Sequence, residues 1–267
     1  MKYITFLSSG KCGDTIAALH AVKKHCEKNQ AKARIVLDCC GKGLVASLGE
    51  NEAAQVNIQT GGNMNFPMSA CQYIKSLIEA QDYVESCEIW DGSTELPHID
   101  INLNEMRKYF LDPEAIKETH TNLQFMYDKL LGVEMKYEPW LSATSTKPPR
   151  PICISRSTRY LSAHLWIASR AKLLERESFF IGTDFEHKVF TDAFDIQIPR
   201  EPTSSALEAA NLIMGSEVFI SPGNLHYWIA LGIGHKNIIN ELCLDVWTTY
   251  YKDTPNISYI QGGRQFK

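Results

Sequence analysis

Short apolar runs alternate along the chain with segments whose apolar residues recur every three or four positions. In the first half, this pattern predicts buried strands over residues 3–7 and 34–38, with a helix between them that begins near Asp14. The other elements predicted in this half are helices over 44–48, 70–80 and 121–131 and strands over 56–58 and 88–90. Residues 91–118 follow neither period, so no element is predicted there.

A proline-rich segment, residues 144–151, interrupts the alternation. Its prolines at positions 148, 149 and 151 lack backbone N–H donors and favour extended conformations, which is typical of a domain boundary. After it the alternation restarts, with strands predicted over 152–154, 178–181, 218–220 and 237–239 and helices over 163–174, 203–214 and 225–231. Residues 261–267 are predicted to be a frayed tail.

Alternating strands and helices indicate parallel β-α units. The predicted fold class is therefore α/β, with one Rossmann-like parallel-sheet domain over residues 1–145 and a second over residues 146–267. We expect the two domains to face a central cleft at the carboxyl ends of their strands, where ligands of such folds bind.

The composition is that of a folded, mildly acidic protein. Of the 267 residues, 44% are hydrophobic and 22% are charged, which is enough apolar material for a core. The 27 Lys and Arg residues against 31 Asp and Glu residues give a net charge of −4. A protein whose main task is to coat nucleic-acid phosphates is normally basic, so the charge does not favour that function.

Eight cysteines are present, and none forms a C-x-x-C pair. The adjacent Cys39 and Cys40 do not suit a disulfide framework, so we expect free thiols in a reducing compartment rather than structural zinc. The N-terminal apolar run is too short for a signal peptide, and no apolar run approaches the roughly 20 residues of a membrane span. These features predict a soluble, cytoplasmic protein.

The first candidate site is the turn after the first strand, where Gly10, Lys11 and Gly13 precede Asp14. Two glycines allow a tight turn, but the spacing is neither that of a dinucleotide-binding fingerprint nor that of a P-loop. Asp14 has two interpretations. It is either an N-cap that accepts backbone N–H groups or a carboxylate at the cleft that acts as a general base.

The second candidate is the polar loop after residues 152–154, which carries Ser155, Arg156, Ser157 and Arg159. Two guanidinium groups and neighbouring hydroxyls at the carboxyl edge of a sheet can hold a diphosphate through bidentate and hydroxyl hydrogen bonds. The alternative is a solvated polar loop without a ligand.

The third candidate is the turn that opens the predicted helix over 225–231, with Ser221, Gly223, Asn224 and His226. The free N–H groups and the dipole of a helix N-terminus form an anion site. His226 lies in the first turn, where it can reach a ligand, although a lone histidine on a helix is more often structural.

Together these segments resemble the heptosyltransferase-type glycosyltransferases, family nine of the GT-B fold. The family's early Gly-Asp is matched by Gly13 and Asp14, and its late turn, Asp-Ser/Thr-Gly-x-x-His, is similar to residues 221–226 with Ala-Leu-Gly following at 230–232. Residues 208–220 and the strand-Gly-Glu element ending at Glu186 are also similar. The likeness covers about 150–240 and the first helix and is poor over 50–145. Ser221 and Pro222 replace the family's Asp and hydroxyl residue, and the chain is short for the fold.

The resemblance implies a metal-independent, inverting transfer of a sugar from a nucleotide-diphosphate sugar to an acceptor hydroxyl. Asp14 is the implied general base, and Gly10, Lys11 and Gly13 form the implied acceptor-side loop. The implied donor- and phosphate-binding residues are Ser155, Arg156, Ser157, Arg159, Glu186, Ser221, Gly223, Asn224 and His226, with Glu186 at the ribose. No cofactor is implied beyond the nucleotide sugar as co-substrate, and no Asp-x-Asp pair for a metal occurs in the chain.

Two other hypotheses stay open at this point. The departures at Ser221 and Pro222 favour a catalytically inactive GT-B-like protein that binds nucleotides or sugars or assists assembly. A sugar-phosphate isomerase or epimerase on the same architecture has no motif in its support. The acceptor is equally open between a glycan, a lipopolysaccharide core, a small molecule and a modified nucleobase.

Overall fold

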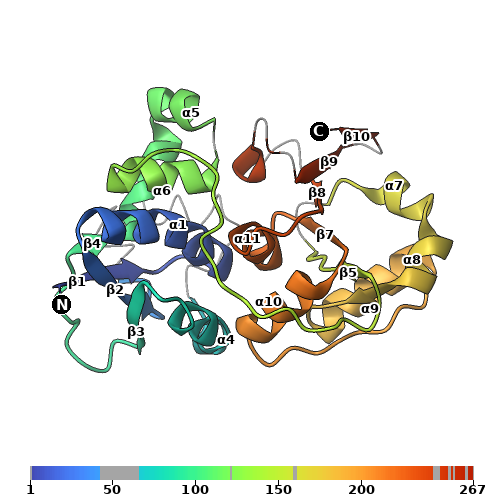
Figure 1. Cartoon of the computed structure of the whole chain (residues 1–267), viewed down its shortest axis with the longest axis horizontal. Coiled ribbons are helices and arrows are strands. Elements are labelled where there is room, and N and C mark those ends of the chain that lie inside the picture. Colours follow the sequence, from blue (N-terminus) through green and yellow to red (C-terminus); the bar gives the residue numbers. More distant parts are fainter. Residues whose placement is uncertain are drawn as a thin grey trace. The chain divides into compact units, whose positions relative to one another are not determined.

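The structure, a computed structural model, describes residues 2–42, 66–120, 122–158, 161–242, 247–251, 254, 256–261 and 264–266. The chain divides into two compact units, Met1–Lys136 and Tyr137–Lys267, and each is built around its own sheet (Figure 1). The helix predicted over 44–48, the strand predicted over 56–58 and Arg159 lie outside the described residues. Across the described part of the chain, no helix combines the length and the apolar character that crossing a bilayer requires.

The first unit has a four-stranded parallel sheet in the order β3-β2-β1-β4. Its elements are β1 (Lys2–Ser8), α1 (Cys12–Lys28), β2 (Ala31–Asp38), α4 (Met68–Glu79), β3 (Val84–Trp90), β4 (Ile101–Asn102), η1 (Leu103–Leu111), α5 (Pro113–Thr119) and α6 (Leu123–Leu131). Strand β1 lies between two neighbours, and its Phe6 and Leu7 side chains are buried, as the apolar pattern predicts.

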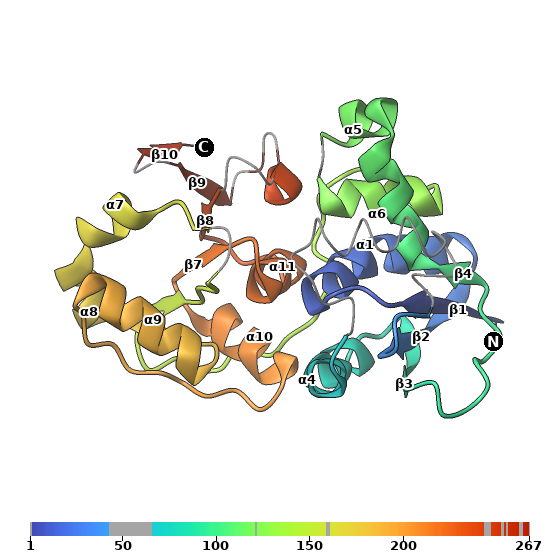
Figure 2. The same ribbon diagram turned by 180° about the vertical axis from the view of Figure 1, so that it is seen from behind.

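Helix α1 packs against α6, as both views show (Figures 1 and 2). The apolar face predicted from its period, Ile16, Leu19 and Val22, is buried. A buried polar contact joins the same two helices, with His20 Nδ1 lying 2.7 Å from Asp128 Oδ1. The first helix of the chain is therefore held against α6 by packing and by a buried hydrogen bond.

The segment in which no element was predicted contains β4, η1 and α5. Its main element, η1, is a 3₁₀ helix, whose three-residue period differs from that of an α-helix. Its neighbours β4 and α5 are short, with two and seven residues, so neither repeats its period often enough to be recognised. This explains why hydrophobic patterning did not find them.

The second unit has a six-stranded sheet in the order β10-β9-β8-β7-β5-β6, parallel except for β10. Its elements are β5 (Ile152–Ile154), α7 (His164–Ala168), α8 (Ala171–Glu177), β6 (Ser178–Phe180), α9 (Asp184–Phe194), α10 (Ala206–Gly215), β7 (Val218–Pro222), α11 (Leu225–Gly232), β8 (Ile238–Glu241), η2 (Trp247–Thr249), β9 (Ile257–Gln261) and β10 (Arg264–Phe266). Its core includes Phe180, Phe190, Ile154 and Ile220.

Two predictions for this unit are wrong. The single helix predicted over 163–174 is two short helices, α7 and α8, separated at residues 169–170. The predicted frayed tail contains a strand, because β10 pairs antiparallel with β9 and the pairing joins Phe266 to Tyr259. Such pairing between strands leaves no signal in local hydrophobic periodicity.

The proline-rich segment packs along α10 of the second unit. The backbone N–H of Thr144 donates to Asn211 Oδ1 at 2.9 Å, and that of Thr146 donates to Asn211 O at 3.2 Å. Gly215 lies so close that a Cβ atom there would stand 1.8 Å from the Thr146 carbonyl oxygen. The segment is thus fixed to one helix by backbone contacts.

Candidate functional site

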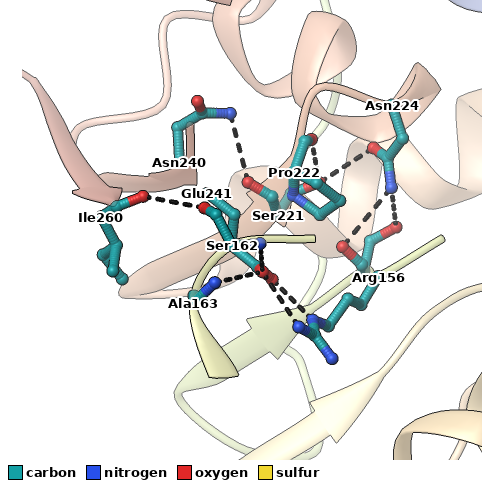
Figure 3. A network of polar contacts seen from close by, with 10 residues as sticks. Arg156, Ser162, Ala163, Ser221, Pro222, Asn224, Asn240, Glu241 and Ile260 are labelled. Atoms are coloured by element: carbon teal, nitrogen blue, oxygen red, sulfur yellow. Dashed lines mark hydrogen bonds and ion pairs between the residues drawn. The ribbon is translucent and has the colours of Figure 1, made fainter. Parts of the chain in front are cut away.

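The carboxyl edge of the second sheet gathers the polar residues of two predicted sites. Ser155 and Arg156 follow β5, and Ser221 is the last residue but one of β7. Glu241 ends β8 and lies beside Arg156 (Figure 3). Because these three strands run parallel and lie in the order β8-β7-β5, their carboxyl ends share one edge. The second and third candidate segments of the sequence are therefore neighbours in space.

A buried ion pair lies at the centre of this edge. Arg156 Nε donates to Glu241 Oε1 at 2.7 Å, and Arg156 Nη2 donates to Glu241 Oε2 at 3.1 Å. Both side chains are buried, and the guanidinium lies over the rings of Phe194 and Phe190, 5.1 and 5.8 Å from their centroids. The backbone N–H of Ala163 donates to the same carboxylate at 3.1 Å.

This pairing changes the interpretation of Arg156. The sequence predicts that its guanidinium binds a diphosphate, whereas the structure gives it a carboxylate partner within the fold. A bidentate pair compensates both buried charges, so Arg156 serves to tie the loop after β5 to the end of β8.

A chain of hydrogen bonds runs from the end of β7 to His226. Ser221 Oγ donates to Asn224 Oδ1 at 2.8 Å, and the same Oδ1 accepts the backbone N–H of Tyr227 at 3.1 Å as the N-cap of α11. With Oδ1 committed as an acceptor, Asn224 Nδ2 donates to Ser155 Oγ at 3.1 Å. Ser155 Oγ in turn lies 2.6 Å from Nδ1 of His226.

Burial sets the charge state of the His226 imidazole. Burial lowers the pKa of His226 to about 4, so the ring is neutral at neutral pH. The Ser155 hydroxyl accepts from Asn224 Nδ2 and shares its contact with His226 Nδ1, so one ring nitrogen of the imidazole is engaged within the fold. His226 is therefore a buried, neutral imidazole in the first turn of a helix, held at Nδ1 by Ser155.

Gly223 holds the turn close to a neighbouring segment. A Cβ atom at this position would lie 2.5 Å from the Thr249 methyl carbon. Thr249 is itself held, since its Oγ1 donates to Asn240 Oδ1 at 3.3 Å and its carbonyl accepts from the Tyr227 hydroxyl at 2.6 Å. A glycine is thus required for the turn to approach η2 this closely.

The remaining residues predicted for the second unit have less defined roles. Ser157 is half-buried in the loop after β5. Glu186 forms a capping box with Thr183, in which its Oε2 accepts the Thr183 backbone N–H at 3.0 Å and the Thr183 hydroxyl at 2.8 Å. One carboxylate oxygen of Glu186 therefore accepts hydrogen bonds from the N-cap residue of its own helix. Ribose binding by Glu186 stays a prediction.

In the first unit, the predicted turn lies between β1 and α1. Lys11 occupies the N-cap position of α1, which begins at Cys12, so the interpretation of Asp14 as the N-cap is wrong. Gly10 is buried beneath Asp14, and Gly13 lies in the first turn of the helix. The Asp14 carboxylate instead pairs with Arg107, whose Nη2 lies 2.6 Å from Oδ2.

Two residues of these sites were missed by sequence analysis. Arg107 lies in η1, inside the segment without a recognisable period, and Glu241 ends a strand whose other residues are mostly apolar. Each contacts a predicted residue that is distant along the chain, Asp14 and Arg156 respectively. An acidic residue close to the carboxyl end of a mostly apolar strand was the available signal for Glu241.

No metal centre is formed by the residues that the structure describes: no group of three or more His, Cys, Asp or Glu side chains there could hold an ion. Groups that could bind an anion are present at the start of α11, where backbone N–H groups of the first turn accompany His226. Donors of this kind suit a negatively charged ligand.

Comparison with known proteins gives no match to any protein-family model and none to a curated protein sequence. Solved structures do match. The family 9 glycosyltransferase from Veillonella parvula is 9% identical and aligns with 90% of this chain and 80% of its own, with a TM-score of 0.55. The E. coli heptosyltransferase WaaC with ADP is also 9% identical, and the alignment covers 98% of this chain and 94% of WaaC, with a TM-score of 0.55.

A third similar structure is the dodecameric, iron-containing glycosyltransferase TibC from enterotoxigenic E. coli. It is 10% identical, and the alignment covers 96% of this chain with a TM-score of 0.52. This chain spans 61% of the length of TibC. At these identities the likeness shows the fold, and it confirms the predicted class of two parallel-sheet domains of the GT-B type.

The Arg156–Glu241 pair yields a stability prediction. Arg156→Met or Glu241→Gln leaves the partner's charge buried without compensation, and each should lower the free energy of unfolding by about 3–5 kcal/mol. The double variant Arg156→Met/Glu241→Gln removes both charges and should lose less than either single variant. Urea unfolding of the four proteins measures this, and a double variant whose loss equals the sum of the single losses would contradict the pairing.

The burial of His226 predicts a pH dependence of stability. The unfolded residue has a pKa near 6.5, whereas burial lowers the folded value to about 4. As the pH falls from 6.5 to 4, only the unfolded state takes up this proton, so stability is lost at up to about 1.4 kcal/mol per pH unit. Below pH 4 this loss ends.

The matched comparison is His226→Asn, which lacks the titrating ring but keeps every other group. Its stability should fall less steeply than that of the wild type between pH 6.5 and 4.5. Unfolding curves at a series of pH values test this. Two parallel profiles would show that the imidazole is not held neutral by burial.

Proposed function

We propose that this protein is a glycosyltransferase that transfers a sugar from a nucleotide-diphosphate sugar to an acceptor hydroxyl with inversion. The observation that carries the proposal is the hydrogen-bond chain from Asn224 through Ser155 to His226 at the start of α11. It presents a neutral imidazole donor beside a helix N-terminus, an arrangement suited to a diphosphate. The fold shared with WaaC, a heptosyltransferase with ADP in its structure, supports the same conclusion.

The second unit is the proposed donor domain. The diphosphate is held by His226 Nε2–H, by the Gly223 N–H of the turn and by the Ser157 hydroxyl. The Asn224 N–H donates to Pro222 O at 2.7 Å and so shapes the turn. Arg156 supports this site through Glu241, and Arg159 supplies the guanidinium of the loop. Negative charge that develops on the leaving diphosphate is stabilised by these donors.

The first unit is the proposed acceptor domain, with Asp14 as the general base and Gly10, Lys11 and Gly13 as the loop beside it. The Asp14 carboxylate takes the proton of the acceptor hydroxyl as the new bond to the anomeric carbon forms. A positioned base contributes about 10²–10⁴ to such a rate. We propose that the reaction needs no metal, because N–H donors meet the leaving group directly, although the similar protein TibC contains iron.

A second candidate function is that of a GT-B-like binding protein without turnover. One observation favours it. The hydroxyl of Ser221, which stands where the resembling family has an aspartate, is buried and donates to Asn224, and Pro222 offers no backbone N–H.

The proposed acceptor is a hydroxyl compound. The proposed compartment is the cytoplasm, in keeping with the free thiols of the described cysteines.

Calorimetry with a panel of nucleoside diphosphates and nucleotide sugars tests the donor site. The wild type should bind at least one of them. Ser155→Ala and His226→Ala should weaken that binding about 10- to 100-fold, because each removes or misdirects a hydrogen bond to a charged group. His164→Ala, which removes an exposed histidine of the same unit, is the control and should bind as the wild type does. Absence of binding across the panel would overturn the proposed function.

Transfer or hydrolysis of the bound donor tests the role of Asp14. Asp14→Asn should reduce turnover about 10²- to 10⁴-fold and leave donor affinity unchanged. Asp82→Asn removes an exposed carboxylate of the same unit and should leave turnover unchanged. Equal rates for wild type and Asp14→Asn would remove Asp14 from catalysis, and binding without any turnover in the wild type would establish the binding protein.

A further inference from the structure

The 3₁₀ helix η1 contacts the turn between β1 and α1 at two points. Asn104 contacts Ser9 at the start of the turn, and Arg107 contacts Asp14 at its end. Residues three apart on a 3₁₀ helix lie above one another, so Asn104 and Arg107 project from the same side of η1. Two side chains on one side of η1 therefore contact the two ends of the turn.

The contact at Ser9 fixes the backbone of the turn. Asn104 Oδ1 accepts the Ser9 backbone N–H at 3.2 Å, and Asn104 Nδ2 donates to Ser9 Oγ at 3.1 Å. The Ser9 hydroxyl donates to Asp38 Oδ2 at 2.5 Å, at the end of the neighbouring strand β2. All three side chains are buried, so the start of the turn is held by a closed polar cluster.

The contact at Asp14 fixes a side chain. Arg107 Nη2 lies 2.6 Å from Asp14 Oδ2, and the pair is only partly accessible, with exposed side-chain fractions of 11% for Arg107 and 24% for Asp14. Within the described part of the chain, Asp14 Oδ1 has no hydrogen-bond partner. One carboxylate oxygen is therefore held by the protein, and the other is left for a substrate.

We infer that Arg107 is a positioning residue for the reaction proposed above, on which this inference rests. It holds Asp14 Oδ2 so that Oδ1 receives the proton of the acceptor hydroxyl. The acceptor oxygen then bonds to the anomeric carbon, the bond from that carbon to the diphosphate breaks, and the diphosphate leaves with the electron pair. Arg107 acts only through Asp14 and exchanges no proton.

Loss of this contact frees the carboxylate to rotate. A displacement of about 1 Å of a reacting group can cost about 10²-fold in rate. Arg107→Met should therefore lower kcat about 10- to 100-fold, with KM for the donor unchanged, because no donor-binding group is altered. Arg107→Lys keeps the charge but loses the planar fork, so its kcat should lie between those of the wild type and Arg107→Met.

The test is a cycle of four proteins: wild type, Asp14→Asn, Arg107→Met and the double variant. If Arg107 acts through Asp14, the double variant turns over no more slowly than Asp14→Asn alone. A merely structural role for Arg107 would lower the rate by the same factor in both backgrounds and would overturn the inference. Arg34→Met, which removes an exposed arginine of the same unit, should match the wild type.

Two further outcomes are distinguishable. If Arg107→Met does not fold, as judged by circular dichroism, the same cycle is run with Arg107→Lys and read in the same way. If Arg107→Met turns over at the same rate as the wild type, this inference is overturned and the proposed function stays intact. A wild type that binds nucleotide sugars but never consumes them overturns the proposed function, and the role of Arg107 falls with it.

Discussion

The buried carboxylate of Glu241 organises the edge of the second sheet. It pairs with Arg156 through two hydrogen bonds and also accepts the backbone N–H of Ala163. Because Ser155 directly precedes Arg156, fixing the guanidinium also fixes the hydroxyl that contacts His226. The ion pair thus helps to orient an imidazole through the neighbouring residue Ser155. Such a pair contributes little net stability, so its value lies in the single arrangement it specifies.

Both units hold their first strand-to-helix turn by the same device. In the first unit, Asp38 at the end of β2 accepts from Ser9, which follows β1. In the second unit, Glu241 at the end of β8 accepts from Arg156, which follows β5. Strands β1 and β2 are neighbours, about 4.8 Å apart, so the short side chain of a serine reaches the carboxylate on the next strand. Strand β7 separates β5 from β8, and there the longer arginine spans the distance.

Much of this architecture could be predicted from the sequence because it depends on local periodicity. The buried strands β1, β2 and β7 and the helices α1, α4, α6, α10 and α11 each show an apolar pattern of the expected period. The 3₁₀ helix η1 and the β9–β10 pair lack such a pattern. The side-chain partners of the sites were also beyond local patterns, since Arg107 is 93 residues from Asp14 and Glu241 is 85 residues from Arg156.

The central claim is that a diphosphate binds at the start of α11, in contact with the neutral imidazole of His226. A crystal structure of the wild-type protein with a bound nucleoside diphosphate tests this claim most directly. The account predicts a phosphate oxygen within hydrogen-bond distance of His226 Nε2 and of the Gly223 backbone N–H, with the Arg156–Glu241 pair intact. A diphosphate bound elsewhere on the chain, or one whose binding breaks the Arg156–Glu241 pair to take the guanidinium for itself, would contradict it.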